Sequence, residues 1–551
     1  MQKAGQDFVP KGEYEMTLKE LLTDLEYDVL DAEGHLVPKK TSAGDKLLQR
    51  EIKDITNDSR KAGEGVLFFA VKGARSDGHD FIHQVKAQGA AAVLVEHMDW
   101  MNQEKAFGEN PDAAKQDAQR SKENDKRQVV YIRVTSTRYA MALVSAAFYG
   151  HPARRMKMIG ITGTKGKTTT TYLVRSILQR AGMDMGLIGT IESTWHEIHR
   201  PAANTTPESL TLQRTLREMA DDGVEAVVME VSSQALKLDR TAGITFDIGV
   251  FTNLSEDHIG PNEHDSFEDY LHCKSLLFRQ CRLGIVNGDD PHAAQILEGS
   301  SCRVLRYGMQ KTNDLYAENL KLIEKPGELG ISFDTKGLME VSCEVPTPGR
   351  FSVYNALSAI SICHEFGVTG EDVARALLGA KAKGRIELVR VSDSFTLMID
   401  YAHNAVALES LLSTLREYHP HRLVTLFGCG GNRSRSRRFE MGEVSGRLSD
   451  LTVITSDNPR DEEPMDIIAD IVTGISGTDG RYVTIPDRKE AIAYAIHNGE
   501  SGDIIVLAGK GHEDYQEIKG VKYPMDERNL IAEILEEDRH GKDASICTGC
   551  H

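Results

Sequence analysis

The stretch MKMIGITGTKGKTTT, residues 156–170, decides the fold. MKMIGIT is apolar enough for a buried strand, and a glycine-rich turn follows it. Apolar residues at three-to-four-residue spacing then predict a helix: Leu173, Val174, Ile177 and Leu178. A strand, a glycine turn and a helix N-terminus together form an anion cradle, because backbone N–H groups point at the bound anion. The stretch therefore predicts an α/β domain that holds the phosphates of a nucleotide.

The glycines of this turn depart from the common Walker spacing, which would need Gly at position 161, where the chain has Ile. The turn can still bind phosphate, because a strand, a glycine-rich turn and a helix N-terminus follow one another. Lys167 can reach the β- and γ-phosphates, and the Thr168 hydroxyl suits Mg²⁺. We predict that the nucleotide is contacted by Gly163, Thr164, Lys165, Gly166, Lys167, Thr168 and Thr169.

Strand-like runs recur on both sides of this turn. Before it they are 65–73, 90–97 and 129–134, and shortly after it 226–230 and 246–254. A third region begins near 384, and its runs end in the polar or glycine-rich stretches YAHN, GGNR, DNPR and KGHE. In open parallel sheets, ligands bind beyond the carboxyl ends of the strands. We therefore expect the chemistry on these four loops and on the phosphate turn.

Composition narrows the class of protein. The 551 residues suggest about three or four domains. With 83 acidic and 65 basic residues, the net charge is −18, which argues against broad binding to nucleic acid or anionic membranes. The chain shows no apolar run of about 20 residues and no export signal, and its eight cysteines are scattered, so we expect a cytoplasmic monomer without a membrane segment.

Two segments stand apart from this pattern. Residues 102–128 are so polar that we predict a mobile surface insertion, because such a segment buries too little apolar surface to offset its ordering entropy. The chain ends in CTGCH, which fits the C-x-x-C-H pattern of haem attachment. Without an export signal, we interpret it as an inert tail.

Further motifs carry a resemblance to a known family. They are NTTPES (204–209), MEVSSQALKLDR (229–240), FTNLSEDHI (251–259), YLHCKSLLF (270–278), PGRFSVYN (348–355), DYAHN (400–404) and DNPR (457–460). With the phosphate turn they resemble the Mur ligases, ATP-dependent amide-bond ligases of peptidoglycan synthesis, and within them the MurE branch, which adds the third residue of the stem peptide. The resemblance covers nearly the whole chain.

The resemblance implies an α/β fold of three domains, with a central P-loop ATPase-like domain and a Rossmann-like C-terminal domain. The implied divisions are a UDP-binding domain over 1–153, an ATP-binding domain over 154–383, an amino-acid-binding domain over 384–540 and a tail over 541–551. It also implies ATP and Mg²⁺ as cofactors. The implied substrates are small molecules: UDP-MurNAc-L-Ala-D-Glu and an amino acid.

The resemblance assigns roles to residues at matching positions. Further ATP contacts are Asn355, Arg385, Asp400 and His403. The implied catalytic residues are Lys167, Glu230, His258 and Lys274, and the implied Mg²⁺ ligands are Thr168, Glu230, His258 and Lys274, the last as a carbamate. The UDP-MurNAc-dipeptide would be held by Ser59, Asn204, Thr205, Thr206, Ser232 and Arg240.

The DNPR motif is similar to the signature of enzymes that add meso-diaminopimelate. Diaminopimelate carries a second carboxylate, for which an arginine is a bidentate partner, whereas lysine lacks that carboxylate. The implied contacts are Arg433, Asp457, Asn458, Pro459, Arg460, Gly509 and Glu513. Three alternatives stay open: the same ligase adding L-lysine or another diamine, a related ligase of the folate-glutamate or cyanophycin type, and a non-catalytic binding scaffold.

Overall fold

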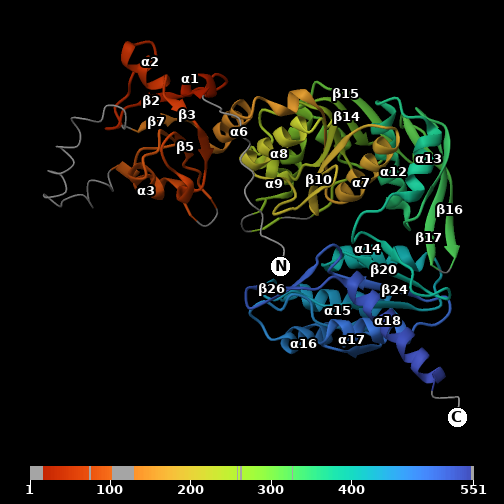
Figure 1. Cartoon of the computed structure of the whole chain (residues 1–551). Coiled ribbons are helices and arrows are strands. Elements are labelled where there is room, and N and C mark those ends of the chain that lie inside the picture. The colour runs from red at the N-terminus through yellow and green to blue at the C-terminus, as the bar shows by residue number, and fades with distance from the viewer. Residues whose placement is uncertain are drawn as a thin grey trace.

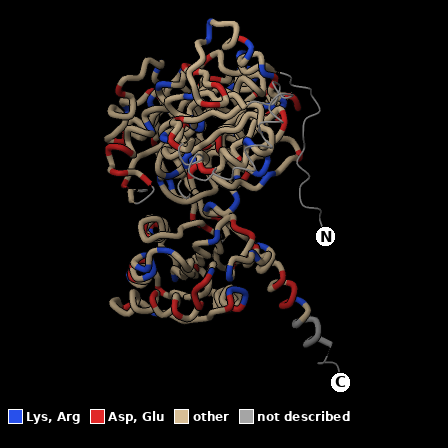
Figure 2. The backbone as a smooth tube through the Cα atoms, turned by 90° about the vertical axis from the view of Figure 1, so that its left-hand side faces the viewer, with Lys and Arg blue, Asp and Glu red and all other residues tan. Residues whose placement is uncertain are grey.

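The computed structural model describes residues 16–73, 76–101, 129–256, 259–260, 263–325 and 327–547. Its strands form three main sheets of five, eleven and six strands. Each sheet belongs to a separate lobe in Figure 1, and the lobes follow one another along the chain. Lys and Arg are interspersed with Asp and Glu in the two lobes that Figure 2 shows clearly. The 102–128 segment lies outside the described residues.

The N-terminal lobe is built on a five-stranded sheet with the order β2-β7-β6-β5-β4. Only β2 runs antiparallel to its neighbour. The strands are β2 (Asp28–Leu30), β4 (Asp54–Thr56), β5 (Val66–Phe69), β6 (Ala92–Val95) and β7 (Val130–Arg133). The other elements are β1 (Met16–Thr17), α1 (Leu18–Leu21), α2 (Ser42–Leu48), β3 (Glu51–Ile52), α3 (Ile82–Ala87) and α6 (Thr137–Phe148). Helix α6 packs against α8 (Ser209–Asp221) and so joins this lobe to the next.

The central sheet has the order β11-β10-β9-β12-β8-β13-β14-β15-β16-β17-β18. Its parallel middle comprises β8 (Lys157–Thr162), β9 (Met185–Ile188), β12 (Ala226–Glu230), β13 (Phe246–Phe251), β14 (Cys281–Asn287) and β15 (Arg303–Gly308). The edges are β10 (Glu192–Trp195) and β11 (Ile198–Pro201) on one side, and β16 (Leu315–Lys325), β17 (Glu328–Gly337) and β18 (Val341–Val345) on the other.

Helices cover both faces of the central sheet (Figure 1). One face packs against α7 (Lys167–Arg180), α12 (Arg350–His364) and α13 (Gly370–Gly379), and the other against α8 and α10 (Phe267–Arg279). Along β8, Ile159 and Ile161 face the first core and Met158 faces the second. Burial on both faces explains why MKMIGIT is continuously apolar rather than alternating. Two short helices, α9 (Ser233–Lys237) and α11 (Ala293–Ile296), complete the lobe.

The C-terminal sheet has the order β19-β20-β24-β21-β22-β23, and only β19 is antiparallel. Its strands are β19 (Glu387–Val389), β20 (Thr396–Asp400), β21 (Leu423–Phe427), β22 (Leu451–Ile454), β23 (Tyr482–Thr484) and β24 (Ile504–Ala508). One face carries α14 (Ala405–Arg416), α15 (Ser436–Leu448) and α16 (Pro464–Ile475), and the other α17 (Arg488–His497) and α18 (Glu527–Cys547). A hairpin of β25 (Tyr515–Ile518) and β26 (Val521–Pro524) follows β24.

Every strand-like run named from the sequence contains a strand of the structure. Among the strands that the sequence analysis did not predict are β9, β14 and the extension formed by β15 to β18. Strand β16 reads LYAENLKLIEK, in which charged residues interrupt the apolar ones. None of the described helices combines the length and the apolar character that crossing a membrane requires.

Candidate functional site

A cavity of about 940 Å³ lies between the central and C-terminal lobes. From the central lobe it is lined by the phosphate turn and by the ends of β12 and β13. From the C-terminal lobe it is lined by the loops that follow β20, β21, β22 and β24. The two sets of strand ends predicted to carry the chemistry therefore face one shared space.

The phosphate turn is shaped by two glycines with positive φ. Gly163 has φ +145°, and a Cβ there would lie 1.9 Å from Thr252 Oγ1. Gly166, the N-cap of α7, has φ +86°. The Lys167 ammonium folds back over the turn and donates to the backbone oxygens of Gly163 (2.8 Å) and Thr164 (3.1 Å). The turn thus places a cation beside the N-terminus of α7, a combination that favours anion binding.

A buried carboxylate stands beside this turn. Glu230 ends β12 and is 1% exposed. Its oxygens accept hydrogen bonds from Thr168 Oγ1 (3.0 and 3.1 Å), Thr190 N (2.8 Å) and Thr190 Oγ1 (3.0 Å). These side chains offer oxygen ligands only, which is the donor set that Mg²⁺ prefers. The structure thus brings two of the predicted metal ligands, Thr168 and Glu230, into contact.

Lys274 lies beneath the phosphate turn. It projects from α10, is 1% exposed, and donates from Nζ to Gly163 O at 3.0 Å. Its Nζ also lies 4.3 Å from the centroid of the Tyr270 ring. Burial distinguishes it from an ordinary solvated helix lysine, and its carbamylation stays a prediction. His258, the remaining predicted metal ligand, lies outside the described residues.

A second polar cluster adjoins Glu230. Thr206 Oγ1 donates to Glu230 O (2.9 Å) and accepts from Ser232 N (3.0 Å), while Arg240 Nη1 donates to Thr206 O (2.9 Å). Thr205 belongs to this cluster and also lines the cavity, and the neighbouring Asn204 is exposed. The predicted acceptor-substrate residues of the central lobe therefore lie together.

Ser59 lies apart from this cluster, in the N-terminal lobe. It opens a short 3₁₀ turn that the Asp58 side chain caps. The Arg60 guanidinium beside Asp58 lowers the pKa of that carboxyl to about 2. Ser59 is half-buried and is not among the residues that line the cavity.

On the C-terminal side, the residues predicted to contact the nucleotide form an aromatic wall. The Arg385 guanidinium lies 4.6 Å from the centroid of the Tyr401 ring, and that ring packs against His403 (4.6 Å) and His512 (4.7 Å). Asp400 accepts from the backbone N–H groups of residues 386 and 402 at 2.9 and 2.8 Å, which holds the chain directly before β19 against the end of β20. Asn355, at the start of α12, closes the cavity from the other lobe.

The C-terminal lobe also lines the cavity with a set of residues that we call the charged pocket: Asp457, Asn458, Arg460, Gly509 and Glu513. Arg460 has φ +52°, and its guanidinium donates to Glu517 Oε2 (3.1 Å) and Gly431 O (2.7 Å). Arg433 is exposed and lines the same cavity, whereas Pro459 is buried behind it.

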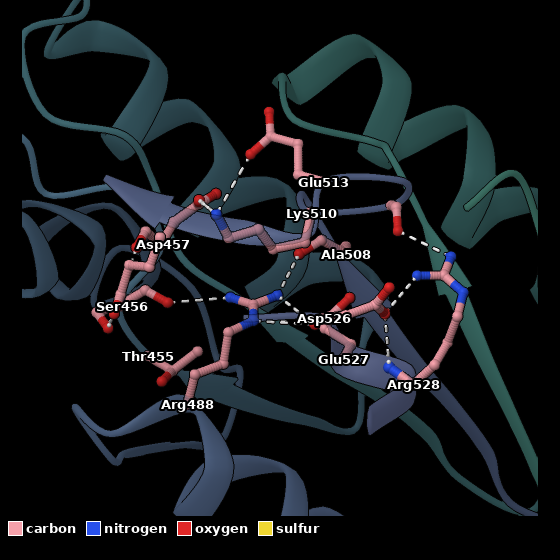
Figure 3. Close-up of polar contacts among 12 residues, drawn as sticks. Thr455, Ser456, Asp457, Arg488, Ala508, Lys510, Glu513, Asp526, Glu527 and Arg528 are labelled. Carbon is pink, nitrogen blue, oxygen red and sulfur yellow. Dashed lines mark hydrogen bonds and ion pairs between the residues drawn. The ribbon is translucent and has the colours of Figure 1, made fainter. Parts of the chain in front are cut away.

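Sequence reasoning missed three buried or half-buried groups that support the charged pocket. Lys510 contacts Asp457, Asn458 and Glu513. Arg488 donates to the backbone oxygens of Ser456 and Ala508 (Figure 3). Glu517 pairs with Arg460. Only Lys510 had a local signal, since it lies between Gly509 and Glu513 in GKGHE.

The fold and the cavity together define a class: a protein of three α/β lobes in which a glycine-rich, lysine-bearing turn, of the kind that holds nucleotide phosphates, shares one cavity with charged side chains of the next lobe. Residues 51–149 match the Mur ligase family catalytic domain, 161–363 the Mur ligase middle domain, and 384–511 the Mur ligase glutamate ligase domain. The chain belongs to the Mur ligase family and is a ligase.

Relatives and solved structures agree with this assignment. A UDP-N-acetylmuramoyl-L-alanyl-D-glutamate–2,6-diaminopimelate ligase of Clostridium tetani (strain Massachusetts / E88) is 37% identical over 525 residues, covering 95% of this chain and 100% of the relative. The enzyme of the same name from Geobacillus thermodenitrificans (strain NG80-2) is 38% identical, covering 89% and 96%. A solved structure of a ligase of that name has a TM-score of 0.64 at 26% identity, covering 96% of this chain and 100% of that chain.

MurF from Acinetobacter baumannii shares the fold, with a TM-score of 0.58 at 19% identity, covering 95% of this chain and 99% of that chain. These findings confirm the family, the MurE resemblance and the three-domain α/β architecture predicted from the sequence.

Proposed function

We propose that this chain is an ATP-dependent ligase that joins meso-diaminopimelate to UDP-MurNAc-L-Ala-D-Glu in peptidoglycan synthesis. One observation carries the proposal: the phosphate turn and the charged pocket line a single cavity. An acyl phosphate made at one wall would meet an amine held at the other without leaving that cavity. The names of the relatives, which share over a third of their residues with this chain, support the same reaction.

The nucleotide would lie along the phosphate turn. Residues 163–169 hold its phosphates, and Asn355, Arg385, Asp400 and His403 hold the rest of the molecule from both lobes. Thr168 and Glu230 would hold Mg²⁺ with His258 and the Lys274 carbamate. When bound, the metal neutralises phosphate charge. Lys167 adds a cation on the same side of the turn.

The acceptor substrate would reach the turn from the N-terminal lobe. Ser59 would contact the uridine diphosphate, and the residues that surround Glu230 would hold the dipeptide: Asn204, Thr205, Thr206, Ser232 and Arg240. The D-Glu γ-carboxylate oxygen attacks the γ-phosphorus of ATP, ADP leaves, and an acyl phosphate forms. The amine of diaminopimelate then attacks the acyl carbon, loses a proton and expels phosphate. Positioning and charge neutralisation supply most of the catalysis.

The charged pocket would select the amino acid. Arg460, Arg433 and the Asn458 amide offer donors to the distal carboxylate, while Asp457, Glu513 and the backbone at Gly509 offer acceptors to the distal ammonium. L-Lysine lacks the distal carboxylate and would not form the hydrogen bonds and ion pairs that these donors offer to it, which costs affinity. The domain limits, the cytoplasmic location and the monomeric state predicted from the sequence remain predictions.

The test compares two amines. The purified chain is supplied with ATP, Mg²⁺ and UDP-MurNAc-L-Ala-D-Glu, and phosphate release is measured with meso-diaminopimelate and with L-lysine. We expect a strong preference for diaminopimelate. A preference for lysine would leave the ligase in place and overturn the role given to DNPR. No release with either amine would overturn the ligase and support a binding scaffold.

A further inference from the structure

Lys510 is a completely buried lysine in the wall of the charged pocket. It follows β24, and its exposed fraction is 0%. Figure 3 shows its side chain running between Asp457 on one loop and Glu513 on another. Burial of an ammonium group without partners is costly, so its contacts explain why the fold tolerates it.

The three hydrogens of the Lys510 ammonium are matched by three acceptors. Nζ lies 2.7 Å from Asn458 Oδ1, 2.6 Å from Tyr515 O and 3.2 Å from Glu513 Oε2. A fourth oxygen, Asp457 Oδ1, lies 3.2 Å away as an ion-pair partner. An ammonium group has three donors and no more. Lys510 therefore acts on a ligand through its neighbours and not by direct contact.

The Asn458 amide shows what those contacts achieve. Its Oδ1 accepts from Lys510 Nζ and from Glu517 N (2.9 Å), and its Nδ2 donates to Glu513 Oε2 (2.9 Å). Lys510 thus ties together the DNPR loop, the GKGHE loop and the start of β25. These contacts fix the orientation of the amide, with its oxygen toward Lys510 and its nitrogen toward Glu513 at the cavity.

Lys510 also sets the charge of the pocket. Asp457 and Glu513 contribute two negative charges that face the cavity, and Lys510 is an ion-pair partner of both. The Arg460 guanidinium is paired with Glu517. Without Lys510, the pocket would be one unit more negative, and the two carboxylates would repel one another. That change penalises an amino acid whose far end carries a carboxylate, but not one whose far end is a lone ammonium.

We propose that Lys510 is a positioning residue that makes the charged pocket selective for an amino acid with a second carboxylate. This inference rests on the proposed function and identifies how the same site would discriminate. The discriminating charge lies on a side chain that does not touch the substrate, one layer behind Asp457, Asn458 and Glu513.

The experiment measures kcat/KM for meso-diaminopimelate and for L-lysine, the latter at high concentration so that a linear slope is obtained. The variants are Lys510→Met, which removes the charge, and Lys510→Arg, which keeps it. The matched control is Lys489→Met, because Lys489 also pairs with two carboxylates, Glu533 and Glu537, but at the surface of α17. ADP affinity, measured by calorimetry, reports whether each variant retains its folded nucleotide site.

In Lys510→Met, the ratio of the two kcat/KM values should fall by about tenfold or more, mainly through a higher KM for diaminopimelate, with ADP affinity unchanged. Lys510→Arg should lower the ratio less than Lys510→Met does, and Lys489→Met should leave the ratio unchanged. An unchanged ratio in Lys510→Met, or an equal loss for both amines, would mean a purely structural lysine and overturn the proposal.

If Lys510→Met fails to fold, Lys510→Gln replaces it. Lys510→Gln keeps a hydrogen-bond donor at the position and removes the charge, so the ratio should fall in the same direction; an unchanged ratio contradicts the proposal. A wild-type chain that turns over neither amine would overturn the proposed function instead, which separates the two failures.

Discussion

The two walls of the cavity are built by different means. The phosphate turn is made of backbone: two glycines, a helix N-terminus and residues that are consecutive from 163 to 169. The charged pocket is made of side chains whose supports come from distant parts of the chain, such as Lys510 on Asn458, 52 residues away, and Glu527 on Arg488, 39 residues away. The residues of a backbone site are consecutive, so a short stretch of sequence predicts it. The residues of a side-chain network are distant in the sequence and meet only when the whole domain folds.

This contrast predicts the largest effect at Gly163. A Cβ there would lie 1.9 Å from Thr252 Oγ1 and 3.1 Å from the backbone of Asn253, so Gly163→Ala must displace the turn. Displacement of about 1 Å in a positioning site costs about a hundredfold, and loss of several aligned donors adds to it. We expect turnover to fall by about three orders of magnitude and ADP affinity, measured by calorimetry, to fall with it.

Gly182→Ala is the matched control for Gly163→Ala. Gly182 also has a positive φ, +89°, but a Cβ there would meet nothing within 4 Å. The Gly182→Ala variant should lose about 1 kcal/mol in free energy of unfolding and should bind ADP with unchanged affinity. If both variants bind ADP equally well, the turn is not the rigid backbone cradle described above.

The same contrast explains what the sequence could and could not predict. The phosphate turn and several parallel strands, such as β8, β12 and β13, follow from local apolar runs and glycines. Lys274 could not be recognised as buried from its helix pattern, because burial depends on the turn packed above it. Strand β16 was missed because charged residues interrupt its apolar ones. The contacts of Lys510 and Arg488 required the packed sheet.

The second prediction tests whether the charged pocket depends on buried ion pairs. Arg488 and Glu527 are 1% and 0% exposed, and Arg488 donates to Glu527 Oε1 (2.9 Å) and to the backbone oxygens of Ser456 and Ala508 (Figure 3). Arg488→Leu would leave Glu527 buried without its cation. Removal of one partner of a buried ion pair lowers the free energy of unfolding by about 3 kcal/mol. Hydrogen exchange of the β22 and β24 amides should show this decrease in local free energy of opening.

A control and a double variant complete this test. Lys489→Met, which removes surface ion pairs only, should change the exchange of those amides far less than Arg488→Leu. Replacing both partners, as in Arg488→Leu with Glu527→Leu, should restore part of the lost stability, because no unpaired charge then remains buried. Equal losses for Lys489→Met and Arg488→Leu would show that burial of the pair has no special importance.

The smallest expected effect is a change in the pH dependence of stability at His512, which packs against Tyr401 in the aromatic wall. Burial, together with the nearby cations of Arg385 and Lys383, lowers the pKa of His512 to about 4. Its Nδ1 is buried and has no hydrogen-bond partner within the described structure, so a proton there would be uncompensated. An unfolded histidine has a pKa of about 6.5. Between these values the unfolded state binds the extra proton, so stability is greatest above pH 6.5 and falls as the pH falls toward 4.

The corresponding measurement is hydrogen exchange of the β20 and β24 amides at pH 7 and pH 5. Wild type should lose more opening free energy between these pH values than His512→Gln does, by about 1 kcal/mol. His272→Gln, at an exposed position on α10, should retain the wild-type pH dependence. If His512→Gln also retains it, the wall tolerates a charged imidazole. In that case the stability of the C-terminal lobe near His512 would not depend on pH in this range. The contrast between a wall built of backbone and a wall built of side chains would then be limited to the charged pocket.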